Sequence, residues 1–515
     1  MNGADSVVQT LVDCGVEACF ANPGTSEIHL VASLNKQKTI RGVLCLHEGV
    51  ATGAADGYGR MAEKPAMTLL HLGPGLANGL ANLHNARRAA SPVVNIIGGH
   101  ASHHNRYAHA ALNSDIEGFA RPVSAWTLST ASALTAPGDA ARAVEAAQRP
   151  PGQVATLIVP ADAAWTEAVR PAKPLPRPPM ASSTAVDAVD AVAAALRRSP
   201  RSGLLLRGQA LQEQGLAAAG RIAAKTGARI LYDTLFPRMQ RGAGRVRADR
   251  IPYFPEAAME FMADLEVLVL VGTNPPVSLF GSPDKPSLLA PEGCRIICLA
   301  REYEDGVGAL EGLAEAVGAP ASPGAVTELA VSAPSDDATL AAATIGQAIA
   351  YHMPEQAIIV DDSGSSGFAS HGGTATARPH DYLFVAGGSI GWGLAAAAGA
   401  AVARPDRKVV CLTGDGSGAM AMQALWTQAR ERLDTVTVVY SNRAYAILDV
   451  EWARAGLGNS APASYFGLDG PAIDWVGLAG AMGVEASRAE STGAFSDQFA
   501  AAIRTRGPRL IEAVI

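Results

Sequence analysis

The stretch CLTGDGSGAM, residues 411–420, decides how the rest of the chain is interpreted. The apolar run from Lys408 to Leu412 predicts a buried strand, and Gly414-Asp415-Gly416-Ser417 predicts a sharp turn after it. The residues from Met420 to Trp426 then predict a helix. A short motif of this kind also fits a plain turn with a capping aspartate, so the surrounding sequence has to decide between a turn and a binding site.

The bulk composition limits the class of protein. With 515 residues the chain should form several domains, and 48% hydrophobic with 17% charged residues predicts a folded globular protein. The net charge of -7 disfavours nucleic acid as the main partner. We see no signal peptide and no apolar run of the ~20 residues that span a bilayer. We therefore expect a cytoplasmic protein with no membrane partner, whose six cysteines are mostly buried, reduced thiols.

Two segments, 169–183 and 318–337, are rich in proline or small polar residues and are expected to be linkers. They predict domains at residues 1–168, 184–317 and 338–515. Continuous apolar runs alternate with helical patterns in each domain, which predicts an α/β protein of three consecutive open, mostly parallel sheets. The predicted strands are VEACFANPG, RGVLCLHEG, PAMTLLHLGPG and SPVVNIIGGH, then RSGLLLRG, ARILYDT, LEVLVLVGTN and CRIICLA, then QAIIVDDSG, KVVCLTGDG, DTVTVVYSN and PRLIEAVI.

A carboxylate and an amide should meet at one edge of the last sheet. Asp415 follows one predicted strand and Asn442 follows the next, so both lie where parallel α/β sheets bind ligands. Their oxygens suit Mg²⁺, which commonly bridges to phosphate. Gly416 and Ser417 begin a helix whose free N–H groups favour phosphate. Together these residues predict a site for a diphosphate with a metal ion.

The Gly-Asp-Gly and Ser441-Asn442 pair at this spacing resembles the thiamine-diphosphate motif of 2-oxo-acid decarboxylases and acetohydroxyacid synthases. VLCLHEGVATGAADGYGRM resembles the family's pyrimidine-binding segment, and FVAGGSIGWGLAAAAGAAVARPDRKVVCLTGDGS resembles the approach to the diphosphate site. The resemblance covers nearly the whole chain and is closest to short acetolactate-synthase-like proteins and benzoylformate decarboxylase. It implies a pyrimidine-binding N-terminal domain, a middle domain and a diphosphate-binding C-terminal domain.

The resemblance also implies which residues hold the cofactor. Asp415, the Asn442 side chain and the Ala444 carbonyl are implied ligands of Mg²⁺; the family usually has Asn-Asn where this chain has Ser441-Asn442, and the retained Asn442 is the ligand. The residues implied to contact thiamine diphosphate or its metal are Glu48, Gly364, Ser365, Gly388, Ile390, Gly414, Asp415, Gly416, Ser417, Asn442 and Ala444.

Three of these residues carry implied roles on the aminopyrimidine. Glu48 would hydrogen-bond N1′ and exchange a proton with it, the Gly388 carbonyl would accept from the 4′-amino group, and Ile390 would press the two rings toward each other. Alternatively, Glu48 is only a carboxylate at a helix N-terminus, and Ile390 is an ordinary core side chain. In this family the first domain of one chain meets the last domain of another at the cofactor. The resemblance therefore implies at least a homodimer, and a homotetramer is common.

The substrate side is less well defined. Thr25 aligns with the active-site serine of benzoylformate decarboxylase and His71 with one of its two catalytic histidines, so both are candidate catalytic residues; the second histidine has no counterpart near Phe280. His71 could instead be a hydrogen-bonded structural histidine. Further candidates for the substrate pocket are His100, Ile447, Leu448 and Glu451, of which Glu451 could equally face solvent.

Two other cofactors are disfavoured. The histidines of HASHHNRYAH, residues 100–109, match no firm zinc spacing, so we expect a loop that reaches the substrate instead of a zinc site. The compact middle domain shows no clear match to flavin-contacting segments, so we expect no FAD.

The sequence therefore predicts an Mg²⁺- and thiamine-diphosphate-dependent enzyme that acts on a 2-oxo acid. Carboligation of an aldehyde or ketone acceptor, as in acetolactate synthase, is preferred because the second histidine is missing; the alternative is simple decarboxylation. A non-catalytic binding subunit of the same fold is a third possibility, against which the intact Glu48, Asp415 and Asn442 argue. A flavin-dependent oxidase of the pyruvate-oxidase kind is the fourth.

Overall fold

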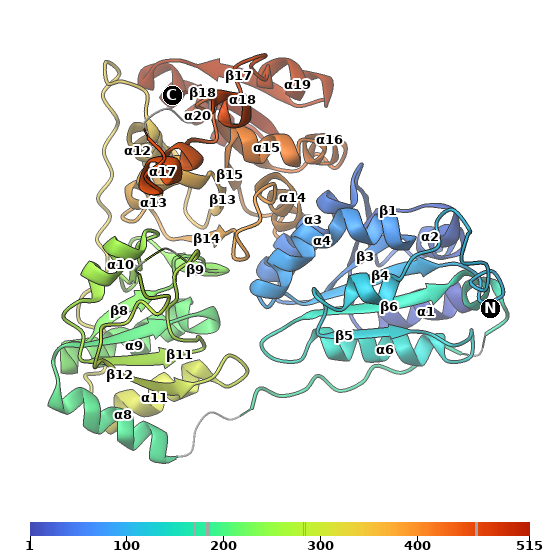
Figure 1. Ribbon diagram of the computed structural model, residues 1–515, viewed down its shortest axis with the longest axis horizontal. Helices are drawn as coiled ribbons and strands as arrows, with labels where there is room; N and C mark the ends of the chain where they lie inside the picture. The colour runs from blue at the N-terminus through green and yellow to red at the C-terminus, as the bar shows by residue number, and fades with distance from the viewer. Residues whose placement is uncertain (169, 182–185, 282, 284, 459–461) are drawn as a thin grey trace. The chain divides into compact units, whose positions relative to one another are not determined.

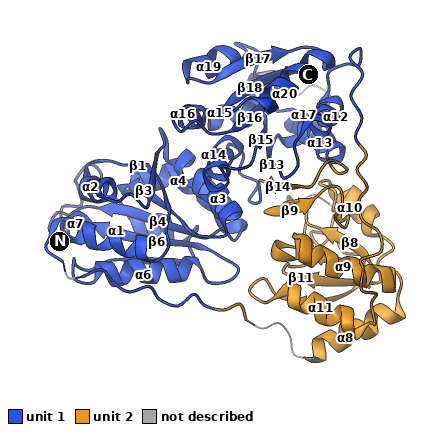
Figure 2. Cartoon of the chain, turned by 180° about the vertical axis from the view of Figure 1, so that it is seen from behind, with its two compact units in different colours: residues 1–178, 331–374, 385–515 blue, residues 179–330, 375–384 orange. Residues whose placement is uncertain are grey.

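The structure is a computed structural model that describes residues 1–168, 170–181, 186–281, 283, 285–458 and 462–515 (Figure 1). Its contacts divide the chain into two compact units (Figure 2). Unit 1 contains residues 1–178, 331–374 and 385–515, and unit 2 contains residues 179–330 and 375–384. Because this division follows contacts, the three predicted domain ranges stay a prediction; residues 169, 182 and 183 of the first expected linker lie outside the described residues.

The N-terminal part of unit 1 is an open parallel sheet with the strand order β2-β1-β3-β4-β6-β5. Strands β3, β4 and β6 are almost entirely buried, as continuous apolar runs require in a sheet covered on both faces. Its elements are α1 (Gly3–Asp13), β1 (Ala18–Asn22), η1 (Thr25–Glu27), α2 (Ile28–Lys36), β2 (Arg41–Leu44), α3 (Glu48–Ala62), β3 (Ala66–His71), α4 (Leu72–Arg88), β4 (Val93–Gly99), α5 (Ile116–Ala120), β5 (Trp126–Ser129), α6 (Ala136–Ala147), β6 (Val154–Pro160) and α7 (Ala161–Trp165).

The C-terminal part of unit 1 repeats this architecture. Its parallel strands follow the order β17-β18-β16-β15-β13. The buried strands β13, β15 and β16 are the ones whose following loops carry the expected cofactor residues. Its elements are α12 (Ala342–His352), β13 (Ile358–Asp362), η3 (Gly364–Ser366), α13 (Gly367–Gly373), α14 (Gly393–Ala403), β15 (Val409–Gly414), α15 (Asp415–Met420), α16 (Gln423–Arg430), β16 (Thr435–Ser441), α17 (Ala446–Arg454), α18 (Ala463–Phe466), α19 (Trp475–Ala481), β17 (Glu485–Ala489), α20 (Thr492–Arg504) and β18 (Arg509–Val514).

Unit 2 contains a third parallel sheet of order β10-β8-β7-β11-β12, and β9 pairs with β14 in the antiparallel sense. The apolar runs of β7 and β11 are fully buried. Its elements are α8 (Val186–Arg198), β7 (Ser202–Leu206), η2 (Gly208–Leu211), α9 (Glu213–Thr226), β8 (Arg229–Tyr232), β9 (Arg238–Arg241), β10 (Asp249–Arg250), α10 (Pro255–Met262), β11 (Val267–Val271), β12 (Arg295–Ala300), α11 (Gly306–Ala316) and β14 (His380–Phe384).

The predicted fold class is confirmed, and every predicted strand is present. The strands that the sequence analysis did not predict include β5, β14 and β17, which are short and carry polar or charged residues, and also β6, which is a fully buried apolar run. The predicted helix from Met420 to Trp426 is wrong in its bounds. Helix α15 already begins at Asp415 and ends at Met420, and α16 starts afresh at Gln423.

Helices α3 and α14 cross with their backbones in contact. A Cβ atom on Gly57 would lie 2.1 Å from the Ala396 carbonyl oxygen, and one on Gly399 would lie 1.8 Å from the Ala54 carbonyl oxygen. Only residues without a side chain permit this approach. The crossing joins the N-terminal and C-terminal parts of unit 1 and brings the middle of α3 against α14.

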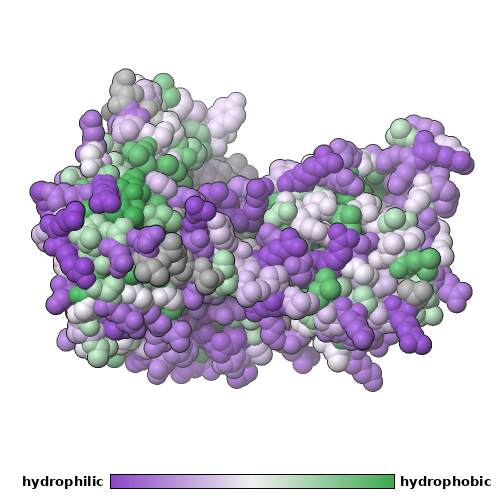
Figure 3. Space-filling model, turned by 90° about the horizontal axis from the view of Figure 1, so that it is seen from below, coloured by the Kyte–Doolittle hydropathy of each residue, from purple (hydrophilic) through white to green (hydrophobic). Residues whose placement is uncertain are grey.

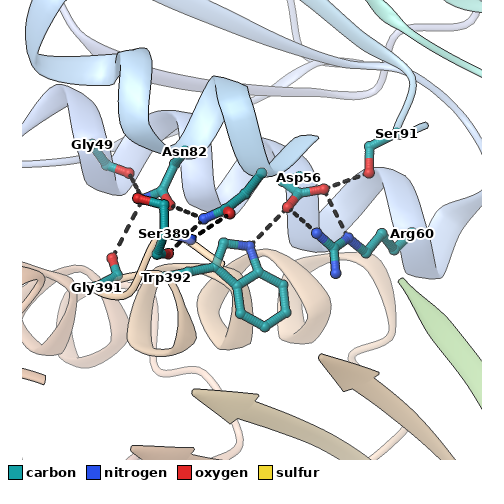
Figure 4. Close-up of polar contacts among 9 residues, drawn as sticks. Gly49, Asp56, Arg60, Asn82, Ser91, Ser389, Gly391 and Trp392 are labelled. Atoms are coloured by element: carbon teal, nitrogen blue, oxygen red, sulfur yellow. Dashed lines mark hydrogen bonds and ion pairs between the residues drawn. The ribbon is translucent and has the colours of Figure 1, made fainter. Parts of the chain in front are cut away.

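A buried polar network secures the same crossing (Figure 4). The Asp56 carboxylate on α3 accepts hydrogen bonds from Arg60, from Ser91 and, at 2.7 Å, from the indole Nε1 of Trp392. The Arg60 guanidinium lies 4.5 Å from the centre of the Trp392 ring. Because Asp56 and Arg60 are buried, removing either one would leave the other as an uncompensated charge, at a cost of about 3–5 kcal/mol.

Asp362, the last residue of β13, holds the start of α14. Its Oδ2 accepts hydrogen bonds from the backbone N–H groups of Gly391, Trp392 and Gly393 at 2.9–3.0 Å. The side chain is 1% exposed, and burial raises its pKa to about 7 against the opposing effect of these donors. A carboxyl group from one strand therefore caps a helix that lies far along the chain.

All six cysteines are free thiols, but only Cys19, Cys45 and Cys411 are buried, and Cys298 is exposed. Polar residues cover most of the face that Figure 3 shows, with apolar residues in patches between them. Within the described residues, no helix has the length and apolar character needed to cross a membrane.

Asp362 makes the stability of the chain depend on pH. Its pKa is higher in the folded chain than the ordinary value of 3.8, so the folded chain holds this proton more tightly than the unfolded chain does. The contribution to folding is therefore complete below about pH 4 and is lost as the pH rises toward about 7. Asp362→Asn keeps an oxygen acceptor without the titration. We expect its thermal unfolding midpoint, measured from pH 4 to pH 7.5, to lack the decrease that this group contributes in the wild type; an identical slope in both proteins would contradict the assignment.

Candidate active site

Asp415 stands at the carboxyl end of β15, where the strand becomes helix α15. Its Oδ1 accepts from the Gly416 N–H at 2.8 Å, and its Oδ2 accepts from the Arg443 N–H at 2.6 Å. Strand β15 pairs in parallel with β16, so the loops that follow both strands emerge at the same edge. The loop after β16 therefore reaches Asp415 through the Arg443 N–H, and the expected pairing of Asp415 with the Asn442 amide as metal ligands stays a prediction.

The loop after β16 is a tight turn. Arg443 adopts a left-handed backbone conformation with a φ angle of 56°, and the Asn442 Oδ1 accepts from the Ala444 N–H at 3.1 Å. Ala444 also forms an isolated antiparallel bridge with Gly467. The turn contacts Asp415 through the N–H of Arg443, the residue between Asn442 and Ala444.

These oxygen donors fit a hard divalent cation. Asp415 is 4% exposed, and burial raises its pKa, so a bound cation would favour the ionised carboxylate. Across the described part of the chain, no three His, Cys, Asp or Glu side chains lie together as possible metal ligands. The expected site differs from such a group, because it combines one carboxylate with an amide oxygen and a backbone carbonyl. The donor set is therefore the kind that Mg²⁺ accepts when phosphate and water complete its shell.

The expected diphosphate residues lie on neighbouring strands. Strand β13 pairs with β15 in the register Asp362 to Thr413, so Gly364 and Ser365 in η3 follow one strand and Gly414 to Ser417 follow the next. A Cβ atom on Gly416 would lie 2.3 Å from the Tyr445 ring, so no other residue fits at this position without a shift. The first turn of α15 and η3 therefore border the same edge of the sheet.

The expected wedge residue is partly exposed. Ile390 lies in the loop before α14 with 36% of its surface accessible, so the interpretation as an ordinary core side chain is wrong. Gly388, two residues earlier, adopts a φ angle of 73° and is exposed. An exposed aliphatic side chain beside a polar turn is what the flat face of a bound ring would cover.

Glu48 is the first residue of α3 and is 7% exposed. Asn78 on α4 donates from Nδ2 to the Glu48 Oε2 at 3.0 Å, and Asn82 donates both to the Gly49 carbonyl and, at 3.4 Å, to the Gly391 carbonyl. Glu48 thus lies at a helix N-terminus, as one interpretation of the sequence proposed. This position is also compatible with a catalytic role for its carboxylate. The expectation that Glu48 serves the cofactor of another subunit stays a prediction, because the structure holds a single chain.

His71 forms a pair with a carboxylate that the sequence analysis missed. Its Nδ1 lies 2.8 Å from the Glu27 Oε2, which also accepts from the Gly24 N–H at 2.7 Å. Glu27 is fully buried; burial raises its pKa, while Gly24 and His71 lower it. The His71 ring packs against Gly24, where a Cβ atom would lie 2.4 Å away, so the neighbouring, exposed Thr25 lies close to the imidazole.

His100 follows β4, whose Gly98 is the register partner of His71, so both histidines lie at the same sheet edge. The His100 ring lies 4.9 Å from the His104 ring, and burial together with His104 lowers the pKa of His100. Its Nε2 is buried and makes no hydrogen bond. Phe280, near which the second decarboxylase histidine was sought, is an exposed residue of unit 2.

Helix α17 carries the remaining pocket candidates. None of its residues is buried; Ile447 is partly exposed, and Leu448 is exposed over 40% of its surface. The Glu451 carboxylate pairs with Arg454 on the same helix at 3.4 Å and remains 39% exposed, which supports its interpretation as a solvent-facing residue.

The residues missed by sequence reasoning had signals of two kinds. Glu27 lies three residues after Gly24, the spacing of a carboxylate that returns to the start of its own helix. Asn78, Asn82 and Asn85 recur at intervals of four and three, which places three amides on one face of α4. A helix usually packs against its neighbours with apolar side chains, so three amides on one face of α4 were a signal of polar contacts there.

Comparisons with known proteins agree with this geometry. Residues 1–119 match the family model described as thiamine pyrophosphate enzyme, N-terminal TPP binding domain, and residues 362–513 match the C-terminal TPP binding domain. A relative from Mycobacterium tuberculosis, named provisionally as acetolactate synthase large subunit IlvX, is 46% identical over 100% of this chain and 99% of its own length. Benzoylformate decarboxylase from Pseudomonas aeruginosa is 27% identical over 97% of this chain and 96% of its own.

Among solved structures, the thiamine diphosphate-dependent 4-hydroxybenzoylformate decarboxylase of Rhodococcus jostii RHA1 is similar, with a TM-score of 0.86 and 25% identity over 99% of this chain and 98% of that chain. The full-length relative and the two matched domains include the segments that carry Glu48, Asp415 and Asn442. This chain therefore belongs to the thiamine pyrophosphate enzyme family.

Proposed function

We propose that this protein is an Mg²⁺- and thiamine-diphosphate-dependent enzyme that decarboxylates a 2-oxo acid and joins the remaining carbon fragment to an aldehyde or ketone acceptor. The observation that carries the proposal is the contact of the Asp415 carboxylate with the turn of Asn442 and Ala444 at the carboxyl edge of parallel strands. This edge also carries the phosphate-compatible turns of η3 and α15. The relative named acetolactate synthase, similar over its whole length, favours carboligation as the outcome.

The residues of the chain would divide the work as follows. Asp415, Asn442 and the Ala444 carbonyl would hold Mg²⁺, and Gly364, Ser365 and the first turn of α15 would hold the diphosphate. Glu48, oriented by Asn78, would exchange a proton with the aminopyrimidine. Bound thiamine diphosphate supplies the nucleophilic carbon and the electron sink that cleavage of a 2-oxo acid requires.

A second candidate, simple decarboxylation to an aldehyde, is favoured by the pairing of His71 with Glu27. A carboxylate at Nδ1 fixes the tautomer of the imidazole and leaves Nε2 available to move a proton at the substrate. Release of an aldehyde needs such a proton donor, whereas carboligation uses the acceptor carbonyl instead. The two candidates therefore differ in how strongly they depend on this pair.

The first experiment is CO2 release from a panel of 2-oxo acids, with added thiamine diphosphate and Mg²⁺ and with products identified by mass. We expect release from at least one acid, and a hydroxyketone as the main product when an aldehyde or ketone is added. Glu48→Gln should retain cofactor binding and lose most turnover, because the amide cannot exchange the proton. Wild-type turnover in this variant, or no release from any acid by a chain that binds the cofactor, would overturn the proposal.

Replacement of Asp415 tests the metal site. Asp415→Ala removes the carboxylate, and we expect Mg²⁺-dependent cofactor binding to weaken by about 100-fold or more, since even indirect partners of a metal commonly contribute 10–100-fold. Asp497→Asn, an exposed carboxylate on α20, serves as the matched control and should bind like the wild type. Titration of each protein with Mg²⁺ at fixed cofactor measures the change, and equal affinities in both variants would exclude Asp415 as a ligand.

Replacement of Glu27 separates the two outcomes. In Glu27→Gln a neutral amide replaces the buried carboxylate, so no negative charge beside Nδ1 balances a proton taken up by the imidazole, and proton transfer at Nε2 is disfavoured. We expect aldehyde release to fall about 100-fold or more, the range of general acid–base catalysis, while cofactor affinity changes little. Hydroxyketone formation should fall less than aldehyde release. Equal losses of both products would show that the pair is needed before the two outcomes diverge.

A further inference from the structure

The loop from Gly387 to Gly391 belongs to no helix or strand, so regular secondary-structure hydrogen bonds do not fix its backbone. Gly388 and Gly391 both adopt left-handed conformations, with φ angles of 73° and 82°. A backbone hydrogen bond connects the Gly388 N–H to the Val385 carbonyl at 3.1 Å. The direction of the Gly388 carbonyl and of the Ile390 side chain must therefore be set by groups outside the loop.

Helix α4 supplies such groups from one face. The Asn85 Oδ1 accepts from the Ser389 N–H at 3.2 Å, and its Nδ2 donates to the Ser389 carbonyl at 2.8 Å. The same Nδ2 donates to the Asn82 Oδ1 at 2.9 Å, and the Asn82 Nδ2 reaches the Gly391 carbonyl (Figure 4). His84 contacts the Gly387 carbonyl through Nε2 at 3.1 Å.

An amide is the side chain that this contact requires. Asn85 is fully buried and meets both the backbone donor and the backbone acceptor of one residue, Ser389, a match that neither a hydroxyl nor a carboxylate makes with two atoms. A Cβ atom on Gly387 would lie 2.5 Å from the Asn85 Oδ1, so the loop approaches the amide as closely as its backbone allows. Asp362 grips the end of the loop through the Gly391 N–H.

We propose that Asn82 and Asn85 are positioning residues that hold Ser389 and Gly391 so that the Gly388 carbonyl and Ile390 face the cofactor ring. The roles of Gly388 and Ile390 rest on the proposed function, whereas the hydrogen bonds that hold the loop do not depend on it. Asn78 on the same helix face binds Glu48, so α4 contacts both the proton-exchanging carboxylate and the loop, which in the implied dimer would serve two different cofactors. Small shifts of this helix would then move both groups together.

If Asn82 and Asn85 only stabilised the fold, their loss should have the same effects as the loss of any other hydrogen bond between the two parts of unit 1. Such a bond exists: the Thr427 Oγ1 donates to the Leu44 carbonyl at 3.1 Å, and Thr427 is fully buried. Thr427→Val keeps the shape and removes this bond, so it is the matched control for Asn85→Ala and Asn82→Ala. Both kinds of variant should lower the thermal unfolding midpoint.

The first readout uses the full chain without cofactor. Backbone amide hydrogen exchange, followed by mass spectrometry over peptides that contain residues 386–393, should be at least about 10-fold faster in Asn85→Ala than in the wild type, because a lost bond of ~1.4 kcal/mol raises local opening tenfold. Thr427→Val should leave these peptides unchanged. Equal exchange in Asn85→Ala and the wild type, or equal acceleration in the control, would overturn the proposal.

The second readout uses the loaded protein. Exchange of the C2 proton of bound thiamine diphosphate with solvent, measured by NMR after acid quench, should slow about 10-fold or more in Asn85→Ala and Asn82→Ala but not in Thr427→Val, with cofactor affinity within about threefold. If Asn85→Ala does not fold, Asn82→Ala decides both readouts. A wild type that binds the cofactor without accelerating C2 exchange would contradict the proposed function, while the exchange of residues 386–393 would still decide the positioning role.

Discussion

The contact of backbone with backbone where α3 crosses α14 is the constraint on which the site depends. Gly57 and Gly399 remove the side chains that would separate the helices, and the Asp56 network holds the contact closed. Each helix begins with a functional group, Glu48 in one case and the loop of Gly388 to Gly391 in the other. A crossing a few ångströms wider would leave both helices intact and break the Asn82 bonds that join the start of α3 to the loop before α14.

The same constraint explains why buried polar groups are concentrated here. An apolar helix contact could slide or rotate at small cost, since hydrophobic packing has no direction. Hydrogen bonds from Asp56, Asp362 and the α4 asparagines specify one register, because a displaced partner would leave a buried polar group unsatisfied. The site therefore gains its accuracy from polar groups that contribute little to net stability.

The sequence predicted the sheets well because buried parallel strands are long apolar runs, as in β4 and β16. It predicted the edge that holds Asp415 and Asn442 because parallel order brings consecutive loops together. It could not predict the Glu27 contact with His71 or the Asn85 contact with Ser389. Those contacts join residues 44 and 304 positions apart, and neither local propensity nor periodicity encodes which distant backbone a polar side chain will meet.

Helix α17 differs from α3, α4, α14 and α15, which all contain buried residues, because none of its own residues is buried. Exposed positions tolerate substitution with little change in folding free energy, whereas Asp415, Glu48 and Asn85 are enclosed by packed neighbours. Exchange of Ile447 or Leu448 would then alter the wall next to the proposed substrate without risk to the fold. Under the proposed function, substitutions at these two positions would change which 2-oxo acid fits, while the buried residues proposed to bind the cofactor stay the same.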